Sequence, residues 1–107
     1  MAISLIRYID INNPDTIDLS ENIASTRFYN TFWEPAINEL GIKFFQENGH
    51  FSKEQLSTVL TELSALKDWA VKNLKGSDLE YMTSRIENLQ NVIPKAFDRN
   101  DVILYIY

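Results

Sequence analysis

Hydrophobic positions follow two different spacings along the chain. From Ile3 to Ile11 the residues are mostly β-branched, aromatic or long aliphatic, and the run stops at turn-forming residues 12–15, which predicts a strand. Residues 102–107 are wholly apolar or aromatic and follow a second turn-forming run at 98–101, so they predict a second strand. We expect these two strands to pair and to pack on the helices between them, since a two-stranded ribbon is marginal alone.

The middle of the chain has the spacing of helices. The first apolar stripe predicts a helix capped by Ser20, with Asp18 or Thr26 as alternative starts. Pro35 then predicts either a kink or a new helix that has Pro35 in its first turn. The stripe continues to Gly49, the expected C-terminal stop.

Two further helices are expected after this stop. Ser52 and Gln55 have the spacing of a capping box and predict a helix that Gly76 ends. A second capping-box spacing predicts the next helix over residues 77–94, ended by a proline, and the short connection predicts an antiparallel hairpin. The expected fold is α+β and mostly α: a helical bundle or hairpin with a small two-stranded ribbon from the chain termini, in a single domain over residues 1–107.

Composition adds size and charge to this picture. The 107 residues are 45% hydrophobic and 23% charged, which is typical of one globular domain that buries its own core. Ten basic residues against 15 acidic ones give a net charge of −5, so nucleic acid and membrane surfaces are not expected as direct partners. With no cysteine, no secretory signal pattern and no membrane-spanning stretch, we expect a cytoplasmic protein.

The negative charge is concentrated in the first third of the chain. Between Tyr8 and Ile42, six acidic residues stand against one basic residue, Arg27, which gives this segment a charge of −5. From residue 51 onward, eight acidic and seven basic residues nearly balance, as on solvated helix faces. A basic protein surface is therefore the expected partner of the first third.

The chain offers few residues for catalysis. His50 is the only histidine and lies in a predicted loop, and the three glycines stand singly, so neither a nucleophilic triad nor a phosphate-binding loop is indicated. Glu80 and Glu87 share one predicted helix face, but 15 acidic residues produce such pairs by chance. We therefore expect no enzymatic activity, no cofactor and no metal site.

Aromatic residues at 28, 29, 32 and 33 form one wide face of a predicted helix. The core is the ordinary place for such a face. In the competing interpretation, Tyr29 or Trp33 points outward among acidic residues and anchors a protein interface. The C-terminal strand poses the same question, because a strand without a polar face is either covered on both sides or exposed for pairing with a partner.

Two stretches carry a family resemblance. Residues 33–41 give an aromatic-rich helix with a glycine turn, and residues 51–63 give a Phe-Ser-x-Glu-Gln-Leu helix start and a Leu-x-Glu-Leu run. With these motifs, residues 28–73 resemble small bacterial immunity proteins, the antidotes of polymorphic toxins and of contact-dependent growth inhibition effectors. The resemblance implies an acidic inhibitor that covers the basic groove of a toxin domain without a catalytic residue of its own, and it assigns no role to any numbered position.

Our first hypothesis is an immunity protein that binds and neutralises a cognate toxin domain, a nuclease with an RNase favoured, by covering its active site with an acidic surface. The expected toxin-binding residues are the acids of the first third with one of two aromatic anchors: Asp10, Asp15, Asp18, Glu21, Glu34 and Glu39, with Tyr29 or Trp33. The alternative is a small helical adaptor or homodimeric regulatory protein without catalytic activity, which assembles through the exposed edge of the C-terminal strand or a face of the hairpin.

Overall fold

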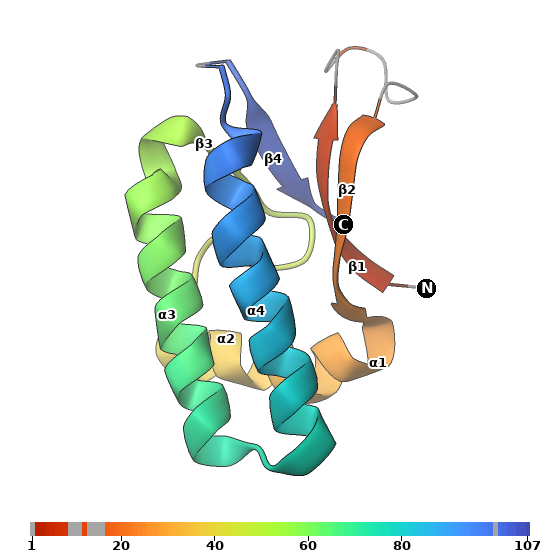
Figure 1. The fold of residues 1–107 in the computed structure, drawn as a ribbon, viewed down its shortest axis with the longest axis vertical. Helices are drawn as coiled ribbons and strands as arrows, with labels where there is room; N and C mark the ends of the chain where they lie inside the picture. The colour runs from red at the N-terminus through yellow and green to blue at the C-terminus, as the bar shows by residue number, and fades with distance from the viewer. Residues whose placement is uncertain (1, 9–11, 13–16, 100) are drawn as a thin grey trace.

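The sheet has four strands where the sequence predicted two. The computed structural model describes residues 2–8, 12, 17–99 and 101–107. Within them the chain forms an α+β fold whose antiparallel sheet has the order β2-β1-β4-β3 (Figure 1). The strands are β1 (Ala2–Tyr8), β2 (Ile17–Ser25), β3 (His50–Ser52) and β4 (Ile103–Ile106).

The predicted pairing of the two terminal strands is confirmed, but a two-stranded ribbon is wrong. β1 pairs with β4, and the sheet is extended by β2 along β1 and by β3 along β4. β2 occupies the segment where Asp18 or Ser20 was expected to start a helix. Register shifts next to Ser4 and Tyr8 interrupt the pairing of β1 with β2, so apolar and polar residues do not alternate regularly along β2. The sequence pattern therefore did not indicate a strand there.

The C-terminal strand lies inside the sheet. β4 is hydrogen-bonded to β1 on one side and to β3 on the other, so neither of its edges is free. The adaptor hypothesis relied on an exposed edge at Val102 to Tyr107, and the structure contradicts that edge. One face of β4 instead points away from the two long helices (Figure 1).

Residues 26–40 form one continuous helical path with two kinds of turn. The segments are α1 (Thr26–Phe28), the π-helix η1 (Tyr29–Trp33) and α2 (Glu34–Leu40). Ser25 is the N-cap, because its hydroxyl oxygen accepts the backbone N–H of Phe28 at 3.2 Å. Of the three expected starts, Thr26 is therefore right as the first helical residue, and Asp18 and Ser20 are wrong because both lie in β2.

Pro35 lies in the first turn of α2, one of the two places expected for it. In an ordinary α-turn the proline ring would clash with the carbonyl four residues earlier. The wider π-turn before it, in which the N–H of Glu34 donates to the carbonyl of Tyr29, relieves that crowding. The helix then ends at Gly41, which has a left-handed φ of 69°, well before the expected stop at Gly49.

The helical hairpin and the first capping box are confirmed. Its elements are the 3₁₀ turn η2 (Lys53–Gln55), α3 (Leu56–Asn73) and α4 (Gly76–Ala96). The N–H of Ser52 donates to Oε1 of Gln55 at 2.9 Å, and the hydroxyl of Ser52 completes the box. The second capping box, at Ser77, is wrong because α4 already begins at Gly76, and Pro94 lies within the last turn of α4 instead of ending the helix.

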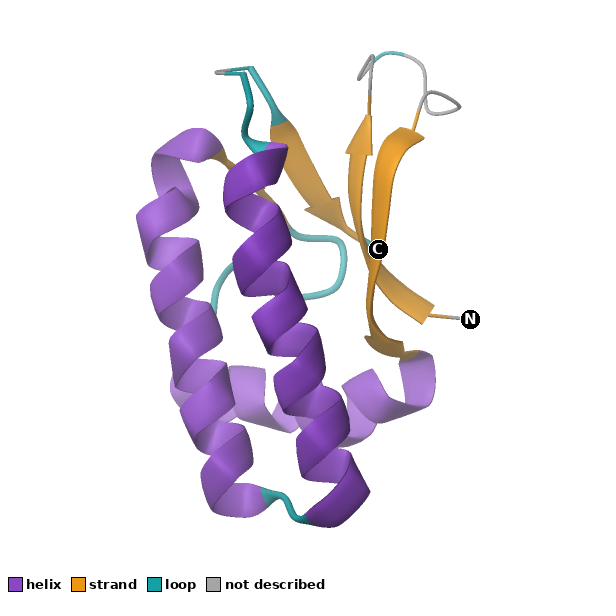
Figure 2. Cartoon of the chain, viewed as in Figure 1, coloured by secondary structure: helices purple, strands orange, loops and turns teal. Residues whose placement is uncertain are grey.

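The core lies between the hairpin and one face of the sheet. In Figure 2, α3 and α4 stand in front of the sheet, while α1 and α2 lie across the end at which β2 stops. All four strands and both long helices contribute fully buried apolar side chains to the core: Leu5, Ile23, Phe51, Leu104, Leu63, Leu66, Met82, Ile86, Leu89 and Ile93. Burial of this apolar surface is the main term that stabilises the domain.

The loop between α2 and β3 is fixed at three points. The carboxylate of Glu62 on α3 accepts the backbone N–H groups of residues 43 and 44 at 2.8 and 3.1 Å. The Tyr29 hydroxyl donates to the carbonyl of Phe45 at 2.6 Å. The N–H of Asn48 donates to the backbone carbonyl of β4's last residue at 2.8 Å. The loop therefore has a defined position although it lacks regular secondary structure.

Candidate functional site

The predicted acidic residues do not form one patch. Of the six, Asp10 and Asp15 lie outside the described residues, Asp18 and Glu21 are on β2, and Glu34 and Glu39 are on α2. The side chains on the two elements contact different neighbours, and α2 lies across the end of the molecule that is farther from the start of β2 (Figure 1). Each predicted position has to be judged by its own contacts.

The charge of Asp18 is already paired within the fold. Its two carboxylate oxygens accept hydrogen bonds from Nε and Nη2 of Arg7 at 2.9 and 3.1 Å. This two-pronged bond is the main cause that raises the pKa of Arg7. Arg7 also donates to the carbonyl of Ala96 at 2.8 Å and lies 3.5 Å from a carboxylate oxygen of Asp98, so the guanidinium ties the sheet to the end of α4.

Glu21 and Glu39 are also engaged by neighbouring helices. Glu21 lies on the helix side of the sheet, where its carboxylate accepts a hydrogen bond from Nδ2 of Asn88 on α4 at 3.2 Å. The carboxylate of Glu39 accepts the indole N–H of Trp69 on α3. Both carboxylates therefore hold helices in place.

Tyr29 and Trp33 belong to the core. Trp33 is fully buried, and Tyr29 is 3% exposed, so the outward-facing interpretation is wrong for both residues and the core interpretation is confirmed. Their rings stack at 6.4 Å with 13° between the planes. The indole N–H of Trp33 has no acceptor among the described residues. Neither ring offers the broad exposed surface that an interface anchor needs.

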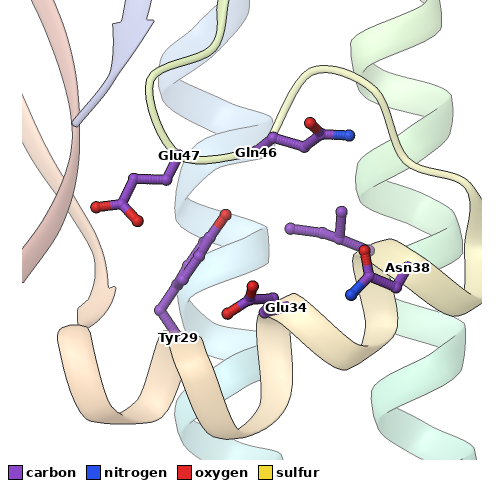
Figure 3. Close-up of a pocket in the computed structure, with 6 residues that line it drawn as sticks. Tyr29, Glu34, Asn38, Gln46 and Glu47 are labelled. Atoms are coloured by element: carbon purple, nitrogen blue, oxygen red, sulfur yellow. The ribbon is translucent and has the colours of Figure 1, made fainter.

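Tyr29 and Glu34 do meet at a small acidic cavity. Its volume is about 220 Å³, and it is lined by Tyr29, Glu34, Ile37, Asn38, Gln46 and Glu47. Figure 3 shows the carboxylates of Glu34 and Glu47 on the two sides of the Tyr29 ring. Among the described residues, neither carboxylate takes part in an ion pair.

The surroundings of the Tyr29 hydroxyl show that this cavity is electronegative. Burial raises the pKa of Tyr29 to about 12, and the charges of Glu34 and Glu47 add to the rise. A hydrogen bond from the backbone N–H of Glu47 acts in the opposite direction. At neutral pH the cavity therefore holds a neutral phenol between two negative charges without a paired cation, and it suits a positively charged group.

Glu47 and Gln46 were missed at the sequence level. The apolar stripe of Ile37, Leu40 and Phe44 predicted a helix that continues to Gly49, and such a helix would carry Gln46 and Glu47 away from Glu34 along its axis. The left-handed Gly41 ends the helix earlier, and the loop folds back over α2. Gly41 itself was the available signal, because a glycine at the end of an apolar helical stripe is a common C-terminal stop.

The remaining chemical candidates do not gather into a site in the described part of the chain. His50 is exposed on β3, Glu80 faces solvent on α4, and Glu87 pairs with Lys67 at 3.1 Å. No group of three or more His, Asp or Glu side chains that could hold a metal ion occurs there. None of the described helices has the length and apolar character to cross a membrane.

Comparisons of the whole chain with known proteins found no match. No protein-family model matches the chain, and neither a curated protein nor a solved structure matches it.

Proposed function

We propose that this chain is an immunity protein that binds and neutralises a cognate toxin domain in the bacterial cytoplasm. The toxin we expect is a nuclease, with an RNase favoured, and inhibition follows from covering its active site with an acidic surface. The observation that carries the proposal is the cavity between Glu34 and Glu47, where two carboxylates without an ion-pair partner flank a buried tyrosine. The resemblance of residues 28–73 to immunity proteins covers the residues that line this cavity.

The cavity gives the proposal a specific contact. Nucleases that bind a phosphate backbone present Lys and Arg side chains, and such a cationic head fits between two carboxylates. Asn38 and Gln46 add amide groups at the rim, so a bound guanidinium would have several acceptors. The excess of negative charge also speeds the encounter with a basic surface at low salt. The mechanism needs no catalytic residue.

The test is co-expression with the toxin domain encoded beside this gene, scored by growth and by co-purification. We expect the wild type to restore growth and to form a stable complex. The double variant Glu34→Gln/Glu47→Gln should weaken binding by about 10- to 100-fold, because it removes both charges from the proposed contact. The matched control is Glu54→Gln/Glu80→Gln, which makes the same charge change at two exposed positions outside the cavity.

The outcomes separate the function from the contact. If the wild type neither protects the cells nor co-purifies with the toxin, the immunity function is refuted. If it protects but both double variants bind equally well, the immunity function stands and the cavity is not the contact. A complex that is insensitive to salt would argue against electrostatic occlusion in either case.

The alternative function, a homodimeric regulatory protein, has one observation in its favour. The sheet carries helices on one face only, and the opposite face is rich in tyrosine. In this alternative the two copies would meet through that face, because the edges of β4 are already paired within the sheet.

A further inference from the structure

The outward face of the sheet is uncharged and aromatic. Side chains alternate along each strand, and the inward ones, such as Leu5, Phe51 and Leu104, are fully buried against the helices. Their neighbours therefore point the other way: Ser4, Ile6 and Tyr8 on β1; Ile17, Ser20 and Asn22 on β2; Ile103 and Tyr105 on β4, with Tyr107 just after it; and His50 and Ser52 on β3. We call these residues the outer face. In the described part of the chain it contains no Asp, Glu, Lys or Arg.

Aromatic rings form a connected layer at the centre of the outer face. Around the Tyr105 ring, Tyr8 lies at 5.6 Å, Tyr107 at 5.9 Å in a stacked arrangement and His50 at 6.0 Å. A hydrogen bond between Tyr8 and Tyr107 joins the layer further and raises the pKa of Tyr8. Beneath these rings Ile6 is only 8% exposed, so the face is already an ordered surface in one copy of the chain.

The layer leaves large apolar side chains exposed around it. The described residues include five exposed large hydrophobic side chains, and three of them belong to the outer face. These are Ile17, Ile103 and Tyr107, with exposed fractions of 47%, 38% and 46%. In Figure 2, both long helices lie on the other side of the sheet. A contiguous apolar and aromatic face of this kind marks an interaction surface.

The chemistry of the face favours a second copy of this chain as its occupant. Single-stranded nucleic acid also stacks on tyrosines, but it needs Lys or Arg for its phosphates, and the described outer face has neither. A basic protein would gain nothing from a face without carboxylates. The face is complementary to itself, because neutral tyrosines and isoleucines meet the same residues across a two-fold axis without bringing like charges together.

The size of the face is sufficient for a weak dimer. Four strands about 4.8 Å apart and on average about six residues long give a projected area of about 400 Å². Side-chain relief raises the accessible area, so two copies bury about 1,000 Å² together, the lower limit for a specific interface. Sheets that pack face to face in this way do so at about 10 Å separation with their strands roughly aligned.

We infer that the outer face is the interface of a symmetric homodimer in which two sheets pack against each other. The inference is independent of the proposed immunity function. It predicts a mass of twice 12.4 kDa by light scattering, at chain concentrations of about 10 to 100 µM.

The first test compares lysine substitutions at two exposed β-branched residues, Ile103 and Val71. Ile103→Lys places one charge from each copy in the interface and should raise the dimer dissociation constant by about 100-fold or more. Val71→Lys makes the same kind of change at a position on α3 that is 61% exposed and should leave the dimer intact. Circular dichroism of both variants reports whether they fold.

The second test introduces no charge into β4, so it can be used even if Ile103→Lys fails to fold. The chain has no cysteine, so Tyr107→Cys introduces a single thiol at the outer face, and Val71→Cys introduces one on α3. Mild oxidation should give a covalent dimer with the Tyr107 variant at least 10-fold faster than with the Val71 variant. A wild type that remains monomeric throughout the concentration range, or equal crosslinking of both variants, overturns the inference. If the wild type is monomeric, and toxin binding is lost in Ile103→Lys but kept in Val71→Lys, the outer face binds the toxin and the homodimer is refuted.

Discussion

The carboxylate of Glu62 holds the loop that provides two of the six residues lining the acidic cavity, Gln46 and Glu47. It accepts two backbone N–H groups of that loop, from Lys43 at 2.8 Å and from Phe44 at 3.1 Å. The same loop provides the Phe45 carbonyl that receives the Tyr29 hydroxyl. Glu62→Ala removes both acceptors at once. We expect it to release the loop, and with it the cavity.

The size of the effect follows from the surroundings of the two bonds. A hydrogen bond to a charged group contributes about 1.5 to 3 kcal/mol, and the full value applies where water cannot replace the lost partner. The N–H of Phe44 is partly buried, while that of Lys43 is exposed and can turn to water. We therefore expect a loss of about 2 to 3 kcal/mol in unfolding free energy for Glu62→Ala. Glu62→Gln keeps one acceptor oxygen and should lose about half as much.

Urea denaturation followed by circular dichroism measures this loss, and hydrogen exchange of the residue 43 and 44 amides locates it. A loss of 2 kcal/mol corresponds to a fall of roughly 8 to 16 °C in melting temperature for a domain of this size. Glu80→Ala, at an exposed position of α4, is the control and should change stability by less than about 0.5 kcal/mol. If Glu62→Ala behaves like this control and the two amides keep their protection, the anchoring role is refuted.

Three further predictions concern the tyrosine, the helix stop and the helix start. The pKa of Tyr29 in the folded protein, about 12, lies above the ordinary value of 10, so the neutral phenol stabilises the fold below pH 10 and this contribution is lost as the pH rises toward 12. Tyr29→Phe should therefore make the decline of stability between pH 10 and 12 shallower, as followed by circular dichroism. An unchanged decline would contradict this. Gly41→Ala should cost about 1 kcal/mol in urea denaturation because φ is 69°, whereas Gly41→Asn should cost less, and equal losses would exclude backbone strain as the cause. Ser52→Ala should cost about 1 kcal/mol by removing the cap of η2, the 3₁₀ turn that leads into α3. Ser57→Ala, which has no cap to lose, should be nearly neutral in the same urea denaturation, and equal losses for the two variants would exclude the capping box as the cause.

The sequence predicted those parts of the fold that depend on local signals. The capping box at Ser52 and the hairpin of α3 and α4 come from residues close to one another in the chain, and both were found. β2 was missed because its pairing with β1 contains two register shifts, so its apolar residues do not repeat strictly at every second position. β3 has only three residues, too few for any period to stand out.

The candidate site was harder to predict because it depends on contacts between distant residues. A count of charges cannot distinguish Asp18, which Arg7 neutralises, from Glu34, which has no ion-pair partner in the described chain. It also cannot bring Glu47 beside Glu34, since that requires the chain to turn at Gly41 and return. Burial of Trp33 followed from the ordinary preference of a large aromatic side chain for the core.

The central place of β4 has a consequence for the order in which the chain folds. One of the two ladder partners of β1 lies about one hundred positions further along the chain, where the backbones of Ser4 and Tyr107 exchange hydrogen bonds of 2.7 and 2.9 Å. Until that segment arrives, the sheet is divided into the β1–β2 hairpin and the isolated β3, and the apolar side of β1 is open to water. Closing such a long loop is costly in chain entropy before any contact repays it. The rate of folding, and the time during which a newly made chain can aggregate, therefore depend on the four residues of β4, which follow the other three strands and both long helices in the chain.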